Sequence, residues 1–169
     1  MKNAVRSLSG VASAWLVALA LVLPMSSPVH AVTQRLDDSQ SPRQRVQSPV
    51  VKFNKTPYDD TGPTHADIRF GWVDYRLNTA RYIGKSARIY YVVPMNIANL
   101  ASPRGLRVDW KSRNGFAAGS ARPGDRVLVW SGVVKSAMLD DSFDLSMTAE
   151  LAYVRGRLGF ESYFEIEVQ

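Results

Sequence analysis

Few residues of this chain could carry out catalysis, and they do not form a complete catalytic set. The sequence of 169 residues contains no cysteine and only two histidines, His30 and His65. A thiol nucleophile is therefore excluded. A Ser–His pair or a histidine-rich metal site would depend on His65, because His30 lies in a leader that we expect to be removed. We accordingly expect a protein that is not an enzyme and that uses no cofactor.

Carboxylates are the next residues whose spacing suggests chemistry. Residues 59–62 read DDTG, and their Asp-Thr-Gly triplet resembles that of the aspartic proteases. That family places the triplet after an apolar strand, in a rigid and buried position where two aspartates share a proton. Here the polar and proline-containing segment around Pro57 and Pro63 surrounds it. We therefore do not expect a protease.

A second group of carboxylates could bind calcium. Residues 139–144 read LDDSFD, which we interpret as a loop between strands. Its candidate metal ligands are Asp140, Asp141 and Asp144. Calcium prefers about six to eight oxygen ligands, and this segment has neither a glycine-shaped cage nor a distant bidentate glutamate. A soluble turn without metal is the simpler interpretation, and calcium binding is the alternative.

Exposed aromatic rings are a further means of recognising a ligand, because they can stack on sugar rings. The candidate rings are Trp72, Tyr82, Tyr90 and Trp110. Trp110 shares its face of an extended chain with Leu106 and Val108, which favours burial in the core. A glycan-binding site therefore depends on where the fold places the other rings.

The elements that must position these residues are β-strands, because apolar residues recur with a period of two. In residues 143–151, five apolar side chains alternate with polar ones, whereas a helix would scatter them around its axis. In residues 66–77 the apolar face changes beside Gly71, which predicts a β-bulge. Pro123 and Gly124 suit the centre of a type II turn. The predicted strands are residues 66–77, 86–93, 105–111, 125–134, 143–151 and 158–168.

This series of short strands predicts an all-β domain over residues 66–169. We expect an antiparallel β-sandwich, immunoglobulin-like in architecture, with a small β-barrel as the alternative. Residues 32–65 are polar and rich in proline, glutamine, serine and aspartate, so we expect a flexible N-terminal arm there.

Residues 1–31 have the pattern of a signal peptide. Lys2 and Arg6 precede an apolar run over residues 11–25, and small residues lead to a cleavage site after Ala31. The run is shorter than the roughly 20 residues that a membrane span needs. We expect export by a Gram-negative bacterium to the periplasm, the cell surface or the medium, with no transmembrane segment after cleavage.

The charge of the expected mature chain is modest. Without Lys2 and Arg6, 19 basic side chains remain against 15 acidic ones, so the net charge falls from +6 to +4. Residues 107–113, RVDWKSR, mix basic and aromatic side chains, but their alternation is typical of a solvated strand face. We expect no nucleic-acid partner, and anionic envelope glycans are the more available ligands for an exported protein.

The last predicted strand raises the question of its pairing partner. Its apolar face consists of Phe160, Phe164, Ile166 and Val168. We expect this strand to lie at an open sheet edge and to accept a strand from another molecule, because unpaired backbone groups recruit other chains. The candidate donor side chains in the arm are Val46, Val50 and Phe53.

This layout resembles that of the subunits of chaperone–usher fimbriae. The resemblance rests on a signal peptide, an N-terminal arm and a final alternating strand, YFEIEVQ over residues 163–169, with RPGDRVLVWSGVV over residues 122–134 as the turn and strand before it. It implies a structural or adhesive surface subunit whose partners are other copies or other envelope subunits, with a periplasmic chaperone. The alternative is a periplasmic or extracellular module that binds a ligand such as a glycan.

Overall fold

The computed structural model describes residues 32–42, 50–54 and 64–169, and in these ranges the chain is built from β-strands and short 3-10 turns. The strands are β1 (Val32–Arg35), β2 (Val50–Asn54), β3 (His65–Asn78), β4 (Ser86–Val92), β5 (Ala98–Leu100), β6 (Leu106–Ser112), β7 (Gly119–Ala121), β8 (Arg126–Val133), β9 (Met138–Glu150), β10 (Val154–Gly159) and β11 (Tyr163–Val168). The 3-10 turns are η1 (Ala80–Tyr82), η2 (Pro103–Gly105) and η3 (Leu151–Tyr153).

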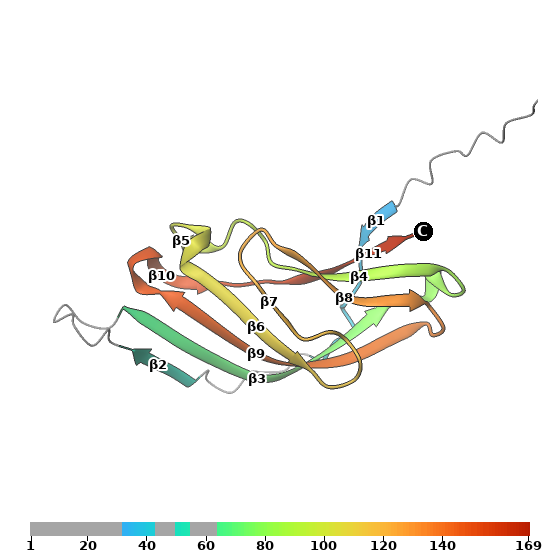
Figure 1. Cartoon of the computed structure of the whole chain (residues 1–169), viewed down its shortest axis with the longest axis horizontal. Helices are drawn as coiled ribbons and strands as arrows, with labels where there is room; N and C mark the ends of the chain where they lie inside the picture. The colour runs from blue at the N-terminus through green and yellow to red at the C-terminus, as the bar shows by residue number, and fades with distance from the viewer. Residues whose placement is uncertain (1–31, 43–49, 55–63) are drawn as a thin grey trace, which may run out of the picture.

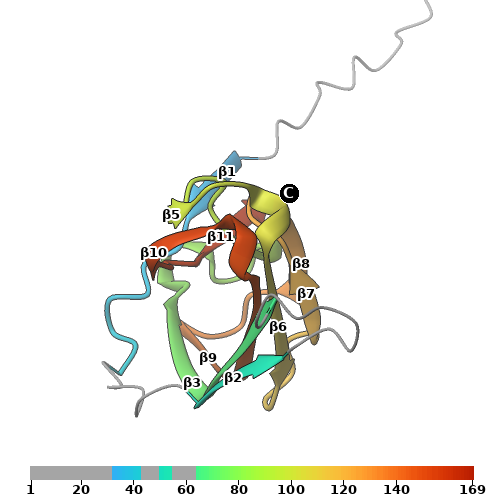
Figure 2. The same cartoon turned by 90° about the vertical axis from the view of Figure 1, so that its left-hand side faces the viewer.

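The strands form an antiparallel β-sandwich, as the sequence predicts. Sheet A has the order β1-β11-β4-β8, and sheet B has the order β2-β3-β9-β6-β7. The short pair of β10 and β5 lies at one end of the sandwich (Figure 1). Seen along the long axis, the two sheets enclose one interior (Figure 2). Neither sheet closes on itself within the described residues, so the barrel alternative does not apply.

The centre of sheet B is the long pairing of β3 with β9. The register of this pair shifts between Arg69 and Gly71, where Gly71 has a φ of 76°. This confirms the predicted bulge, since a positive φ is most readily adopted by glycine. The bulge lets Ile68 and Phe70 on one side of it, and Val73 and Tyr75 on the other, all pack against the core.

Interlocked aromatic rings fill the middle of the core. Phe143 of β9 contacts Trp110 of β6 with ring centroids 6.0 Å apart, and it contacts Tyr91 of β4 at 5.6 Å. Phe164 of β11 lies 5.3 Å from Tyr91 and 4.9 Å from Tyr75 of β3. Such pairs add about 0.5–1.5 kcal/mol each beyond the burial of their area, so these rings hold the two sheets together.

The Tyr91 hydroxyl keeps a polar partner inside this core. It donates a hydrogen bond to Ser162 Oγ at 2.7 Å, so the buried oxygen is not left unsatisfied. Burial raises the pKa of Tyr91 well above its ordinary value, because the phenolate would be poorly solvated there. Tyr91 is therefore a neutral hydrogen-bonding group that ties Ser162 to the core.

Two local predictions about turns and loops have opposite outcomes. Arg122 O accepts a hydrogen bond from Asp125 N at 3.0 Å and Gly124 has a φ of 96°, which confirms the type II turn. Residues 139–144 are not a loop, because they belong to β9 and pair with β3. The alternation that we assigned only to residues 143–151 begins earlier, and the aspartates simply occupy strand positions.

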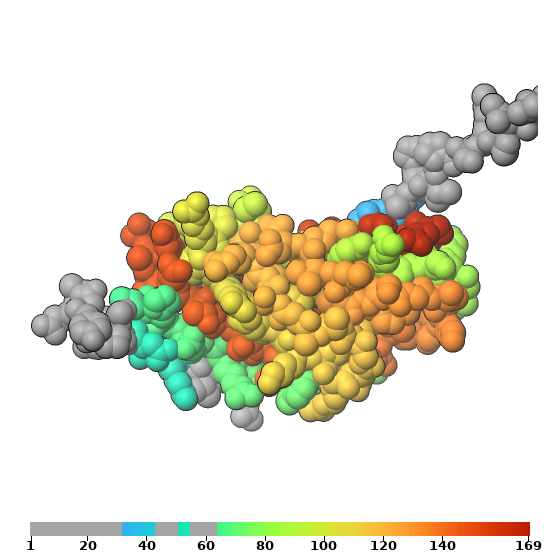
Figure 3. Space-filling model, in the orientation of Figure 1, coloured from blue at the N-terminus to red at the C-terminus, as the bar shows by residue number. Residues whose placement is uncertain are grey.

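The N-terminal arm contributes more to the fold than we predicted. Residues 32–35 form β1 at the edge of sheet A, and residues 50–54 form β2 at the edge of sheet B. β1 and β2 lie toward opposite ends of the molecule (Figure 3). A sheet edge offers backbone donors and acceptors to any extended segment, so a polar segment can join a sheet without an apolar face of its own.

The expectation that the last strand has an open edge is wrong. β11 pairs with β4 on one side and with β1 on the other, in a register that runs from Val32 opposite Val168 to Arg35 opposite Glu165. Leu36 N adds a hydrogen bond to Phe164 O at 2.9 Å, and the Leu36 side chain is buried. The chain therefore supplies the neighbour of its own final strand.

Among the described residues, no helical segment has the length and hydrophobicity that crossing a bilayer requires.

Candidate functional site

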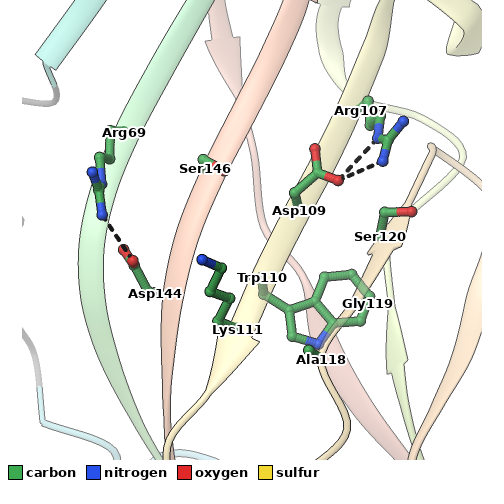
Figure 4. A pocket seen from close by; sticks show the side chains of 10 residues that line it. All are labelled: Arg69, Arg107, Asp109, Trp110, Lys111, Ala118, Gly119, Ser120, Asp144 and Ser146. Atoms are coloured by element: carbon green, nitrogen blue, oxygen red, sulfur yellow. Dashed lines mark hydrogen bonds and ion pairs between the residues drawn. The ribbon is translucent and has the colours of Figure 1, made fainter.

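The outer face of sheet B carries a polar hollow of about 700 Å³. Strands β3, β9, β6 and β7 line it side by side (Figure 4). The side chains that matter for recognition are Arg69, Arg107, Asp109, Lys111, Asp144 and Ser146. A hollow of this size is within the usual range of small-ligand sites, although its lining is more polar than most.

The alternation of β6 determines which of its residues reach this hollow. Leu106, Val108 and Trp110 point into the core and are at most 3% exposed. Their neighbours Arg107, Asp109 and Lys111 must then point outward, because successive side chains of a strand lie on opposite faces. Burial of the apolar positions thus fixes the direction of the charged ones.

Two ion pairs hold the charged side chains at opposite sides of the hollow. Arg69 Nη2 lies 2.9 Å from Asp144 Oδ2, and Arg107 donates to Asp109 Oδ1 from Nε at 2.9 Å and from Nη2 at 2.8 Å. Such exposed pairs contribute only about 0–1 kcal/mol each to stability. Their main effect is to orient the guanidinium groups.

Lys111 is the unpaired charge of the hollow. Its side chain lies between Asp144 and Asp109 in the close view (Figure 4), and it forms no hydrogen bond or ion pair with another described residue. The ammonium group keeps its three donors for water or for a ligand. An anionic group that enters the hollow could therefore pair with Lys111 without breaking an existing ion pair.

Trp72 adds an exposed aromatic ring next to this hollow. It stands opposite Asp144 in the pairing of β3 with β9, and 42% of its surface is exposed. The Arg113 guanidinium lies 4.1 Å from the centroid of the Trp72 ring. A cation over an indole face fixes the orientation of the ring and brings a further positive charge to the same side of the sheet.

Of the other three predicted ligand aromatics, Trp110 is part of the lining of the hollow, whereas Tyr82 and Tyr90 lie elsewhere. Trp110 is 3% exposed, stacks on Phe143 and donates from Nε1 to Ala117 O at 3.0 Å, so it belongs to the core. The Tyr82 hydroxyl donates to Gln34 Oε1 at 2.7 Å, which links η1 to β1. Tyr90 lies in sheet A, on β4. The four rings therefore form no shared platform.

Tyr90 belongs to an ion-pair network on the outer face of sheet A. The Arg126 guanidinium lies 3.3 Å from its ring centroid and donates to Glu165 at 2.8 Å and to Glu167 at 3.2 Å. Partial burial lowers the pKa of Arg126, because a buried guanidinium is less well solvated. The hydrogen bonds to the two glutamates outweigh this effect, so the pKa of Arg126 is raised overall. The glutamates of β11 are thus engaged with arginine and are not free acids.

The three aspartates proposed as calcium ligands do not converge, which corrects that alternative. Asp140 pairs with Arg76, and Asp144 pairs with Arg69. Asp141 is 2% exposed and accepts hydrogen bonds from the backbone N–H groups of the loop after β6. The reason is the strand geometry, because adjacent residues of β9 point to opposite faces. No group of metal-ligating side chains occurs among the residues that the structure covers.

The residues predicted for strand exchange are dispersed. Phe164 and Ile166 are fully buried in the chain's own core, and Val168 is partly buried. Phe53 of β2 is 62% exposed, the backbone of Val50 pairs with Arg69, and Val46 lies outside the described residues. The DDTG segment, residues 59–62, also lies outside them.

Phe160, one of the predicted acceptor residues, lines an opening. An apolar slot of about 410 Å³ enters between the two sheets beside β3, with Phe70, Tyr75 and Leu145 among its walls. Arg35, Asp38 and Glu161 place charges of both signs in its lining. This slot lies on the side of the sandwich opposite β7 and β8, which contact each other across the sheets.

Sequence reasoning named Trp110 and Asp144 as candidates but did not assign the other polar residues of the hollow to a site, namely Arg69, Arg107, Asp109, Lys111, Ser120 and Ser146. The signal for Lys111 was present, since the alternation of residues 105–111 places it outward next to Asp109. Arg69 and Ser146 reach the hollow only because β3 and β9 lie beside β6 in sheet B. The alternation of apolar residues does not predict this order of strands.

Comparisons of the chain with protein-family models, with curated proteins and with solved structures found no match.

Proposed function

We propose that this protein is an exported, non-enzymatic binding module that holds an anionic carbohydrate on the outer face of sheet B. The observation that carries the proposal is Lys111, an ammonium group that has no ion-pair partner among the described residues, in a hollow whose two arginines are already oriented by carboxylates. An acidic group of a sugar would pair with Lys111, and the oriented arginines would add directed donors.

The polar groups around Lys111 suit a sugar better than a simple inorganic anion. Asp109 and Asp144 can each accept hydrogen bonds from sugar hydroxyls, and Ser146 can donate or accept. Trp72 offers a partly exposed ring next to Asp144, on which an apolar sugar face could pack. A bare phosphate or sulfate would use the cations but would meet repulsion from both carboxylates.

Export places such a module where anionic envelope glycans are available. The signal peptide and its cleavage after Ala31 belong to this proposal, and the pattern of residues 1–31 supports them. The function is then retention or recognition of envelope polysaccharide in the periplasm or at the cell surface. The inventory of catalytic side chains supports a binding role over an enzymatic one.

Calorimetric titration of the protein expressed from its full-length gene tests this function. The titrants are oligogalacturonate, which carries carboxylates, and a neutral oligosaccharide of equal length. We expect binding of the acidic oligomer only, weakened about fivefold by Lys111→Ala, which corresponds to the loss of one exposed ion pair. Lys135→Ala, which removes an exposed lysine outside the hollow, is the control. Equal affinity of Lys111→Ala and the unaltered protein would refute the proposed site.

A second candidate function, assembly by strand addition, is favoured by the pairing of β1 with β11. In this pairing, β1 of the arm lies against β11, which is the predicted acceptor strand. Both strands belong to the same chain, whereas strand addition would join two chains. β1 has only exposed side chains, and Leu36 is the buried anchor that follows it. Because β1 pairs with β11 through backbone groups, the same pairing could form with β11 of another copy, which is how strand exchange produces oligomers.

An engineered disulfide distinguishes pairing within a chain from pairing between chains. Thr33 and Glu167 are partners in the register, and the chain has no cysteine of its own. Oxidised Thr33→Cys/Glu167→Cys protein should form linked dimers or longer species if β1 is exchanged. The control is Arg88→Cys/Glu167→Cys, which joins β4 and β11 of one chain. If both variants give only monomers, strand exchange is excluded.

A further inference from the structure

A second, smaller hollow continues the first one along the outer face of sheet B. It measures about 260 Å³ and lies toward the start of β6. Arg104, Arg122, Thr148 and Glu150 line it, and it shares Arg107 and Asp109 with the hollow around Lys111. Because the two hollows have residues in common, a ligand could pass from one to the other without leaving the surface.

Cations outnumber carboxylates along this joined surface. Besides His65, the two hollows together contain five arginine and lysine side chains, Arg69, Arg104, Arg107, Lys111 and Arg122, and three acidic ones, Asp109, Asp144 and Glu150. The resulting excess of two positive charges is spread along the strand direction. The surface therefore attracts a ligand that carries more than one negative charge.

Each hollow holds one lysine or arginine side chain that has no partner within the described ranges. Lys111 is that group in the first hollow, and the Arg104 guanidinium forms no hydrogen bond or ion pair with the described part of the chain. Arg122 donates from Nη1 to Arg104 O at 2.8 Å, which fixes Arg122 beside Arg104. The two free cations are then separate contact points for two separate anionic groups.

The distance between these contact points favours a long ligand. Leu106 follows Arg104 closely, and from Leu106 to Lys111 the strand covers about 17 Å at roughly 3.3 Å per residue. Because the backbone positions of the two cations are this far apart, an extended molecule with repeated acidic groups is suited to engage Lys111 and Arg104 together.

From these observations we propose that the ligand is a linear acidic polysaccharide, of the kind that carries a carboxylate on successive sugars, and that it lies along β6 across both hollows. This inference rests on the proposed function and names the ligand class of the same site. One end of the path lies near Trp72 and Arg113, and the other lies at Arg104 and Arg122.

The carboxylates on the surface favour a polysaccharide over a nucleic acid. Double-stranded DNA carries a negative charge about every 1.7 Å along its axis, so its phosphates would lie close to Asp109, Asp144 and Glu150 and be repelled. A uronate chain has wider spacing and hydroxyl groups between its charges. Those hydroxyls can donate to the same carboxylates, which turns the acidic side chains into specific acceptors.

The test compares oligogalacturonates of increasing length on the protein expressed from its full-length gene. We expect affinity to rise with chain length and then to level off once the chain spans both hollows. Arg104→Ala should weaken the long oligomer about fivefold and leave a disaccharide unaffected, whereas Lys111→Ala should weaken both. Arg155→Ala, at an exposed arginine of β10 that lines neither hollow, is the matched control.

The outcomes separate this inference from the function on which it rests. If Arg104→Ala binds the long oligomer as well as the unaltered protein while Lys111→Ala does not, the ligand is short and the inference is wrong, but the binding function stands. If Lys111→Ala has no effect on either ligand, the function itself fails. Equal competition by a single-stranded oligodeoxynucleotide of matched charge would overturn the ligand class, because it would show attraction by charge alone.

Discussion

Replacing Asp141 with asparagine should destabilise the fold far more than a surface substitution would. Asp141 Oδ2 accepts hydrogen bonds from Ser112 Oγ and Phe116 N, both at 2.8 Å. Oδ1 accepts from Arg113 N at 3.2 Å, Asn114 N at 3.0 Å and Ser142 N at 2.6 Å. One buried carboxylate therefore satisfies most of the backbone donors at the turn from β6 toward β7.

Asparagine cannot reproduce this pattern in either orientation of its amide. One of its two terminal atoms becomes an NH2 donor, which then faces backbone N–H groups that also donate. Loss of a charge-assisted hydrogen bond costs about 1.5–3 kcal/mol, and a buried N–H left without an acceptor costs about 1–3 kcal/mol more. We expect a loss of about 3–5 kcal/mol, which is a large share of the roughly 5–15 kcal/mol that stabilises a typical domain.

Urea unfolding of Asp141→Asn measures this loss, and Asp140→Asn is the matched control. Asp140 is the preceding residue, its side chain is 55% exposed, and it pairs only with Arg76, so its substitution should cost about 1 kcal/mol or less. Hydrogen exchange of the Asn114 and Phe116 amides should quicken in Asp141→Asn alone. If the two variants unfold at the same urea concentration, the loop does not depend on the Asp141 carboxylate and the reasoning is refuted.

The remaining predictions concern pH and packing. Burial opposes ionisation of Asp141, but hydrogen bonds from Phe116, Asn114, Ser112 and Ser142 outweigh it and lower its pKa below the ordinary 3.8. A lowered folded-state pKa means that its stabilisation is complete above about pH 4 and is lost as the pH falls further, so acid titration should bring the stability of the unaltered protein toward that of Asp141→Asn. Leu36→Ala should cost about 2–5 kcal/mol by urea unfolding and speed exchange of the β1 amides, whereas Val32→Ala, at a position that is 54% exposed, should cost little. Gly119→Ala would place a Cβ 2.7 Å from Trp110 Cζ2 and should cost about 1–3 kcal/mol, visible as altered tryptophan fluorescence, while Ser120→Ala should leave that signal unchanged.

Pairing at the sheet edges was the part of the fold that sequence reasoning placed wrongly. The composition of residues 32–65, polar and rich in proline, predicts a flexible arm outside the sandwich. The pairing of β1 with β11 uses backbone groups, which every residue other than proline provides, and leaves all four side chains exposed. Side-chain patterns therefore carried no information about it, apart from the single apolar residue Leu36.

In the candidate site, too, the sequence predicts the direction of single side chains but not which of them lie together. Alternation in residues 105–111 placed Lys111 on a polar face, and alternation in residues 143–151 placed Asp144 on the outward face of its strand. Lys111, Asp144 and Arg69 lie close together because β3, β9 and β6 are neighbours in sheet B, although these strands are far apart in the chain. The calcium alternative failed for a related reason, because a segment interpreted as a loop proved to be part of a strand.

The sequence alone determined the longer strands β3, β4, β6, β8, β9 and β11, the bulge at Gly71, the turn at Pro123 and Gly124 and the buried position of Trp110, because each depends on the conformation and alternation of neighbouring residues. Only the tertiary structure decided which strand lies beside β11 and which charged side chains share a hollow on sheet B. Strand order is set by the packing of two whole sheets around one core, and no short stretch of residues contains that information.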